Sequence, residues 1–152
     1  CRYAEFARRW RGEPGERFDT SQVRETVVAV RAGKGMVLNP NDHDTWSAGS
    51  FFTNPLVSPD QVPEGAPAFA QSDGRVKTSA AWLIDHAGYG KGFKVAEDAP
   101  ASLSTKHVLA LTNRGGASSG DFTTSARTHT DGLPDAYGLT GLPEPRLIGC
   151  TI

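Results

Sequence analysis

The sequence predicts a single α+β domain, and three observations support this fold class. The chain has 152 residues, 38% of them hydrophobic, which is enough for one domain with a core and too little for two large ones. Segments with helical spacing and short strand-like runs follow one another in mixed order. No internal repeat and no low-complexity tract is present, so a repeat architecture is not expected.

Helices are expected near the start of the chain. In residues 1–10 aromatic side chains recur at a spacing of three and four, which favours one or two helical turns. A second helix is expected to begin at a cap formed by Thr20 or Ser21 and to end at the glycines on either side of Lys34. The apolar stripe of this helix consists of Val23, Val27 and Val30.

Turns, one helix and one strand are expected in the middle of the chain. Residues 39–44 (NPNDHD) have turn composition, and residues 58–75, rich in Pro, Gly, Ala and Asp, are expected to form an exposed loop. Residues 79–88 form a short helix that ends at its glycine. Residues 89–105 show little periodicity, and HVLALTN at 107–113 predicts a buried strand.

The last part of the chain is expected to be less regular. Residues 118–131 have helical spacing after cap-like serines, but several threonines and serines in the interior weaken the helix. Pro134 is expected to prevent its clean continuation, because proline lacks the backbone donor. The final ten residues, PEPRLIGCTI, favour an extended segment.

Charge and cysteine content exclude several classes of protein. The formal net charge is −1, which argues against a nucleic-acid-binding surface. No apolar run approaches the roughly eighteen residues that a membrane span needs, so no membrane partner is expected. Cys1 and Cys150 do not make a disulfide framework, which favours a reduced, cytoplasmic setting. Because the first residue is not methionine, we expect a piece of a longer protein or a missing true start.

The stretch SAGSFFTNP (47–55) places a serine before two adjacent phenylalanines. A serine hydroxyl is a nucleophile only beside a base, and the GxSxG turn of hydrolases is absent because Phe52 stands where the second glycine must be. Ser50 could instead donate a proton. On composition alone, a loop serine bonded to the backbone is the simpler interpretation.

Glu144 lies between Pro143 and Pro145. Proline fixes its own φ and restricts the residue before it, so Glu144 has little backbone freedom. Such stiffness suits a positioned acid or base, and it fits an exposed turn carboxylate equally well.

Three further residues are candidates for an anion site. Lys34 and Lys91 each lie between glycines, where a lysine can approach a phosphate, although a glycine-rich helix end is also an ordinary C-cap. His107 opens the predicted strand and can be a core histidine or a site residue. No GxxxxGK[ST] and no GxGxxG pattern is present. On these grounds the sequence indicates a soluble α+β domain with an anionic ligand as one possibility.

A metal site is not expected. His43 lies between Asp42 and Asp44, which are three residues of metal-ligand type. Neighbours in sequence rarely converge on one ion, and no Cys/His spacing of a zinc site exists.

Six segments in a fixed order carry a resemblance to a known family: RYAEF, VRAGKGMVL, SAGSFFTNP, SAAWLIDHAGYGKG, STKHVLALTNRGGAS and LPEPRLIG. Together they resemble the C-terminal, substrate-binding domain of the UDP-N-acetylenolpyruvoylglucosamine reductase family, in its actinobacterial form. SAGSFFTNP and PEPRLIG are the most specific of these motifs. The resemblance implies one domain over residues 1–152, with a small, mainly antiparallel sheet packed by helices.

The resemblance also implies a reaction. In the family NADPH reduces a bound FAD, and hydride then reaches UDP-N-acetylglucosamine enolpyruvate, giving UDP-N-acetylmuramate for peptidoglycan synthesis. The FAD-binding domains of the family precede this one and supply an arginine beside the substrate carboxylate. This chain does not contain them, so by itself it is expected to hold neither cofactor and to be inactive. A stand-alone UDP-sugar-binding module without redox activity is the alternative, and a decayed remnant is a third.

Individual residues acquire roles from the resemblance. Ser50 matches the proton donor of the family, and Glu144 matches its catalytic glutamate, which stabilises an enolate-like intermediate or relays a proton. His107 matches a polar residue close to the substrate. The family positions that hold the substrate are matched by Tyr3, Lys34, Asn54 and Lys91. The chain departs from the family pattern in the helix before Pro134, where the usual charged amphipathic helix is interrupted.

Overall fold

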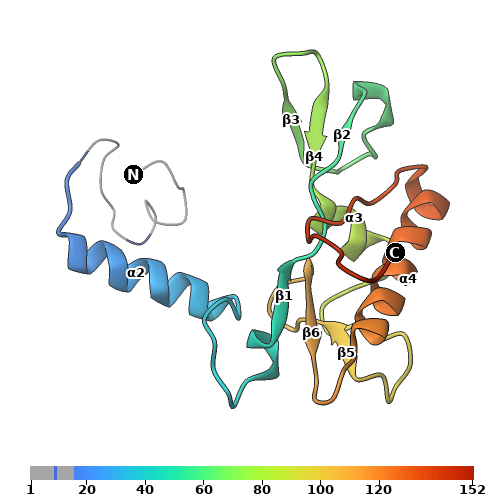
Figure 1. The fold of residues 1–152 in the computed structure, drawn as a ribbon. Coiled ribbons are helices and arrows are strands. Elements are labelled where there is room, and N and C mark those ends of the chain that lie inside the picture. The colour runs from blue at the N-terminus through green and yellow to red at the C-terminus, as the bar shows by residue number, and fades with distance from the viewer. Residues whose placement is uncertain (1–8, 10–15) are drawn as a thin grey trace.

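The computed structural model describes residue 9 and residues 16–152, and it confirms the predicted α+β class (Figure 1). Within these residues, three α-helices accompany two small antiparallel sheets of three strands each. The resemblance implied a single small sheet, so the division into two is a difference from the expectation. Apart from residue 9, the helical turns predicted for residues 1–10 lie outside the described residues.

The first sheet has the strand order β1-β6-β5, with β1 at Ser47–Ser50, β6 at Ala110–Asn113 and β5 at Ala101–Leu103. The predicted strand at 107–113 is therefore shorter, because the Ala110 N–H donates to the His107 carbonyl in a turn at 3.0 Å. Strand β5 was not predicted. All three of its residues are buried, so it lacks the alternation of a half-exposed strand.

The second sheet has the order β2-β4-β3, with β2 at Leu56–Val57, β4 at Val76–Thr78 and β3 at Ala68–Ala70. The prediction of an exposed loop over 58–75 is wrong in part, because this range includes β3 and a 3₁₀ turn, η2, at Pro59–Gln61. All three residues of β3 are exposed. Backbone pairing with β4, rather than a buried face, therefore holds this strand.

Helix α2 spans Thr20–Gly33, close to the predicted range, but Asp19 is its cap instead of Thr20 or Ser21. The Asp19 carboxylate accepts the backbone N–H of Ser21 at 2.9 Å, because a β-region residue with a short polar side chain suits this position. Of the predicted stripe, Val30 alone is fully buried. In Figure 1 this helix stands apart from the rest of the domain.

Helix α3 spans Ala80–His86, and helix α4 spans Ser119–Tyr137. The predicted interruption of α4 at Pro134 is wrong, because the helix continues through this residue to a left-handed cap at Gly138. A proline so close to the helix end removes one backbone donor, and the Gly138 N–H still reaches the Pro134 carbonyl at 2.8 Å. No helix of the described ranges is long and apolar enough to cross a membrane.

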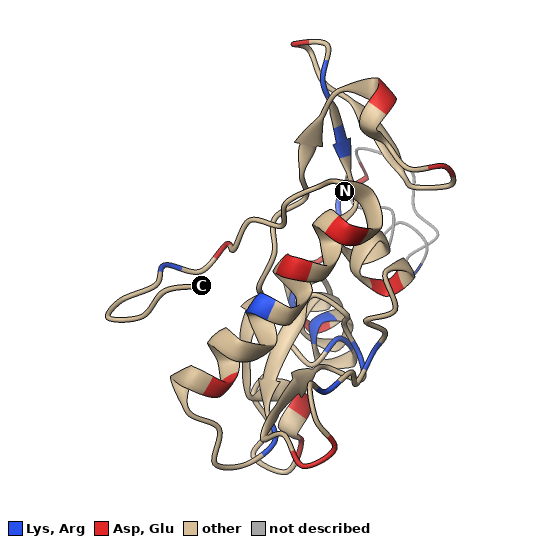
Figure 2. Cartoon of the chain, turned by 90° about the vertical axis from the view of Figure 1, so that its right-hand side faces the viewer, with Lys and Arg blue, Asp and Glu red and all other residues tan. Residues whose placement is uncertain are grey.

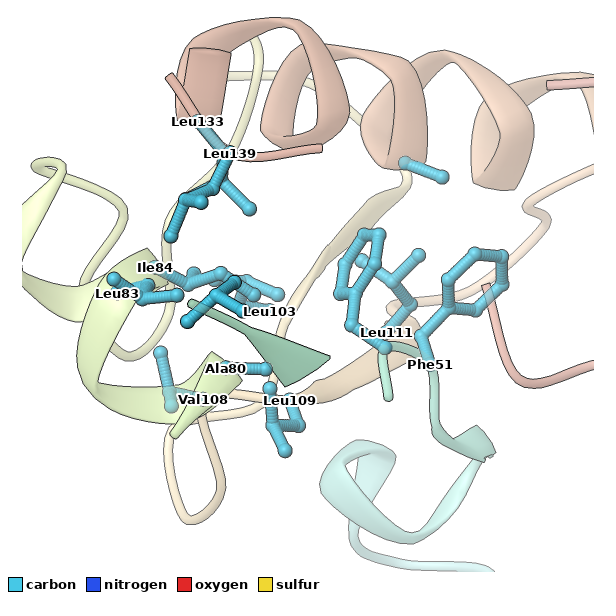
Figure 3. Packing of buried hydrophobic residues seen from close by; sticks show 13 residues of the cluster. Phe51, Ala80, Leu83, Ile84, Leu103, Val108, Leu109, Leu111, Leu133 and Leu139 are labelled. Atoms are coloured by element: carbon cyan, nitrogen blue, oxygen red, sulfur yellow. The ribbon is translucent and has the colours of Figure 1, made fainter. Parts of the chain in front are cut away.

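The core fills the space between the first sheet, α3 and α4 (Figure 3). Phe51 and Phe52 are both buried, at 4% and 2% exposure, although adjacent residues of a regular strand face opposite ways. The strand ends at Ser50, and the two rings meet edge to face at 5.2 Å. The two phenylalanines therefore anchor the chain directly after Ser50.

Candidate functional site

Ser50 is the last residue of β1, directly after Gly49. Gly49 has a φ of +79°, a conformation that favours glycine, and it coincides with an irregular register between β1 and β6. The Ser50 side chain is half-buried, and its hydroxyl has no hydrogen bond to any other described residue. The simpler interpretation expected a loop serine whose hydroxyl bonds the backbone. Instead, Ser50 lies in a strand, and its hydroxyl bonds no described backbone group.

Glu144 reaches the same place from the other end of the chain. Its backbone N–H donates to the Phe51 carbonyl at 2.8 Å, and Pro143 pairs with Phe52 in an isolated bridge. Ser50 and Glu144 consequently line one pocket of about 270 Å³, whose other lining residues are Ala48, Gly49 and Pro145. The exposed Glu144 carboxylate is brought beside Ser50 by backbone pairing of segments far apart in sequence.

A second pocket, of about 530 Å³, extends from Ser50 toward the end of α2. Gly49 and Ser50 line both pockets, and Gly35 and Arg31 lie at the α2 side. Arg31 was not singled out as a site residue. Its one sequence signal is a position in the last helical turn, just before the Lys34 turn. This second pocket connects the Ser50 region to the segment that carries Lys34.

Lys34, Lys91 and His107 form the cationic cluster. His107 is half-buried; burial lowers its pKa, and the nearby charges of Lys34 and Lys91 lower it further. The His107 Nδ1 accepts the Leu109 N–H at 3.2 Å, so the neutral ring carries its proton on Nε2. The charges of both lysines thus act on the His107 ring, although the three residues lie far apart in sequence.

The cationic cluster is joined to Ser50 through the backbone. The carbonyl of Leu109, whose N–H faces His107, accepts the Phe51 N–H at 2.8 Å. Phe51 directly follows Ser50. Figure 2 shows acidic and basic residues interspersed along the ribbon, so the cluster is a local feature instead of part of a broad basic face.

The remaining predicted substrate residues are placed differently. The Asn54 Oδ1 accepts the Ala80 N–H at 2.9 Å, at the start of α3, where Ser79 accepts the Trp82 N–H. Asn54 lines neither of the two pockets that Ser50 lines. Tyr3 lies outside the described residues.

The NDHDT turn has partners that the sequence did not suggest. It forms a 3₁₀ turn, η1, at His43–Thr45, and no group of three or more potential metal-ligating side chains occurs within the described residues. Burial opposes ionisation of Asp44, but hydrogen bonds from Thr105 and Arg114 outweigh it and lower its pKa to about 2. Asp42 pairs with Lys106. Only turn composition in the sequence pointed to this network.

Fold and site together define an α+β domain in which Ser50 lines two pockets, one shared with Glu144 and one that extends to Gly35, next to Lys34. Residues 39–148 match the family model described as UDP-N-acetylenolpyruvoylglucosamine reductase, C-terminal domain. The chain belongs to this family.

Curated relatives agree with this assignment. A UDP-N-acetylenolpyruvoylglucosamine reductase of Cutibacterium acnes is 90% identical over 151 residues, which are 99% of this chain and 40% of the relative. The reductase of the same name from Mycobacterium tuberculosis H37Rv is 51% identical, covering 99% of this chain and 44% of the relative. That of Streptomyces coelicolor is 49% identical, covering 99% and 42%. The chain thus spans less than half the length of these relatives.

Proposed function

We propose that this chain is the substrate-binding and proton-donating domain of an FAD- and NADPH-dependent reductase. The reductase converts UDP-N-acetylglucosamine enolpyruvate to UDP-N-acetylmuramate in peptidoglycan precursor synthesis, in the cytoplasm. One observation carries the proposal. Ser50 and Glu144, the two residues that the resemblance identifies as catalytic, line one pocket although they lie far apart in sequence.

The reduction adds a hydride to one carbon of the enolpyruvyl double bond and a proton to the other. Bound flavin supplies the hydride. Negative charge then develops on the carbon next to the carboxylate, and Ser50 donates its hydroxyl proton to this carbon. Because Ser50 is only half-buried, water can return a proton to its oxygen. Hydride and proton together balance the two-electron reduction.

Glu144 acts on the same carbon or on Ser50. Its place in the pocket allows it to relay a proton or to stabilise the enolate-like state through a shared hydrogen bond. The hydrogen bond from the Glu144 N–H to the Phe51 carbonyl fixes the backbone of Glu144 in space beside the residue that follows Ser50. Such pre-positioning is what an acid–base group needs.

The cationic cluster binds the diphosphate of the substrate. Two ammonium groups and a neutral histidine N–H offer charge-assisted hydrogen bonds to phosphate oxygens. A substrate with a diphosphate at one end and an enolpyruvyl group at the other fits a pocket that extends from Ser50 to Arg31 and to Gly35, next to Lys34. Tyr3 and Asn54 are further substrate contacts by resemblance. FAD and NADPH are held by the part of the reductase that precedes this domain.

The test is the Ser50→Ala substitution in a complete reductase that contains this segment. Flavin reduction by NADPH should keep its rate, whereas reduction of the enolpyruvyl sugar should fall at least about a hundredfold. Ser72→Ala, in the exposed turn between β3 and β4, is the matched control and should leave both half-reactions unchanged. If Ser50→Ala supports both half-reactions at full rate, Ser50 is not the proton donor.

A UDP-sugar-binding module without redox activity is the second candidate. It is favoured by one observation: Ser50, Glu144 and the cationic cluster all come from this chain. The two candidates differ in what the chain does when joined to the flavin-binding part of a relative. The enzyme domain restores turnover of the enolpyruvyl sugar, whereas the module binds it without turnover.

A further inference from the structure

Asp44 touches the turn that carries Lys34. Gly35, directly after Lys34, has a φ of +70° and is buried. A Cβ on Gly35 would lie 2.9 Å from the Asp44 carbonyl oxygen and 3.4 Å from the Asp44 Cβ. The backbone of the lysine turn therefore packs directly on Asp44, with no room for a side chain between them.

The Asp44 carboxylate also binds the loop that carries His107. One oxygen accepts the Thr105 N–H at 3.0 Å, and the other accepts the Thr105 hydroxyl. Thr105 precedes His107 by two residues. Because both donors of one residue meet both oxygens of one carboxylate, the orientation of this loop relative to η1 is fixed.

Thr105 in turn contacts the turn that carries Lys91. The Thr105 methyl lies 3.5 Å from the place where a Cβ on Gly92 would stand. The Gly92 N–H also donates to the Ser104 carbonyl at 3.2 Å. Each member of the cationic cluster is thus within two residues of a group that contacts Asp44 or Thr105.

Arg114 links Asp44 to the sheet. The Arg114 guanidinium bonds Asp44 Oδ1 at 2.5 Å and Ser102 Oγ, on β5, at 2.6 Å. Asp44 itself is 4% exposed. The Asp44 carboxylate therefore has partners on two segments, at Thr105 and Arg114, while its backbone packs on a third at Gly35. Moving Asp44 would leave its buried charge unpaired.

We propose that Asp44, acting through Thr105, is a positioning residue that holds Lys34, Lys91 and His107 together as one anion-binding cluster. Asp44 does not touch the anion itself. The identity of the anion as the substrate diphosphate rests on the proposed function, but the positioning role does not.

The test uses variants of the whole chain and two readouts. NMR follows the titration of the His107 ring, and calorimetry follows the binding of inorganic pyrophosphate. Asp44→Asn should raise the pKa of His107 toward its ordinary value, because the loosened loop exposes the buried ring and the two lysines move away. Loss of the negative charge alone would lower that pKa, so the sign separates the two explanations. Pyrophosphate affinity should fall about tenfold, as expected for one weakened charge-assisted contact.

Thr105 variants keep the proposal testable if Asp44→Asn fails to fold. Thr105→Val removes the hydroxyl that Asp44 accepts and should raise the pKa of His107. Thr105→Ser keeps that hydroxyl but loses the methyl that faces Gly92, so its effect should be smaller. Asp73→Asn is the matched control, because it breaks an exposed aspartate–arginine pair in the β3–β4 turn and should change neither readout.

Two results would overturn the proposal. One is a His107 titration that is unchanged in both Asp44→Asn and Thr105→Val, and the other is a pKa that falls in Asp44→Asn. Failure of the unsubstituted chain to bind pyrophosphate would instead count against the proposed function, while the His107 titration would still decide the positioning role.

Discussion

His129 on α4 should make the stability of the domain sensitive to acid. The side chain is fully buried, and its Nδ1 bonds the Ser125 carbonyl at 2.5 Å. Aromatic rings surround it, with the Tyr89 and Phe93 centroids at 4.9 and 5.5 Å. Its Nε2 has no hydrogen-bond partner in the described part of the chain. A second proton on this ring would therefore be a buried charge without a counter-ion.

The magnitude follows from the proton affinities of the folded and unfolded states. Burial lowers the pKa of His129 from 6.5 to about 4, although the Ser125 carbonyl partly opposes this. The unfolded chain thus binds the proton more tightly. The contribution to stability is complete above pH 6.5 and is lost as the pH falls toward 4, by about 3 kcal/mol in all. Between pH 7 and pH 5 the loss is about 2 kcal/mol.

The assay is urea unfolding at pH 7 and pH 5, followed by tryptophan fluorescence. The parent chain should lose about 2 kcal/mol more over this interval than His129→Phe, which cannot titrate. Equal losses in the parent and His129→Phe would show that protonation of His129 does not cause the loss of stability.

Two further predictions concern packing and capping. Gly132→Ala should lower the thermal midpoint despite the usual gain of about 1 kcal/mol for alanine in a helix, because its Cβ would lie 2.0 Å from the Tyr89 hydroxyl. Gly33→Ala in α2 is its control, because no neighbouring atom lies within 4 Å of the added Cβ, and it should raise the midpoint. A higher midpoint for Gly132→Ala than for Gly33→Ala would contradict the packing. Asn54→Ala should reduce the free energy of unfolding by about 1 kcal/mol by removing the acceptor for the Ala80 N–H. Asn54→Asp keeps that acceptor, and equal losses in both variants would exclude a capping role.

The elements that the sequence predicted are those with a local signal. Helices α2 and α3 follow from polar caps and apolar spacing. Strand β5 has no local signal, since burial on all sides comes from tertiary packing. The error at Pro134 has the same origin, because tolerance of a proline depends on where the helix ends, and Gly138 sets that end.

The sequence could single out individual residues of the candidate site, but it could not predict how they are arranged in space. Motifs pointed to Ser50 and Glu144 one at a time. Their meeting depends on the hydrogen bond between the Phe51 carbonyl and the Glu144 N–H, which no spacing reveals. Asp44 was considered only as a turn residue and as a metal ligand beside His43, because its partners Thr105 and Arg114 are distant in sequence.

We propose that this chain contains a formed pocket for UDP-N-acetylglucosamine enolpyruvate. The most direct measurement is a calorimetric titration of the purified chain with this compound, with the visible spectrum recorded for bound flavin. We expect saturable binding at one site per chain without flavin absorbance, and a loss of at least about tenfold in affinity for Lys34→Gln. A folded chain that binds no enolpyruvyl sugar would contradict the claim.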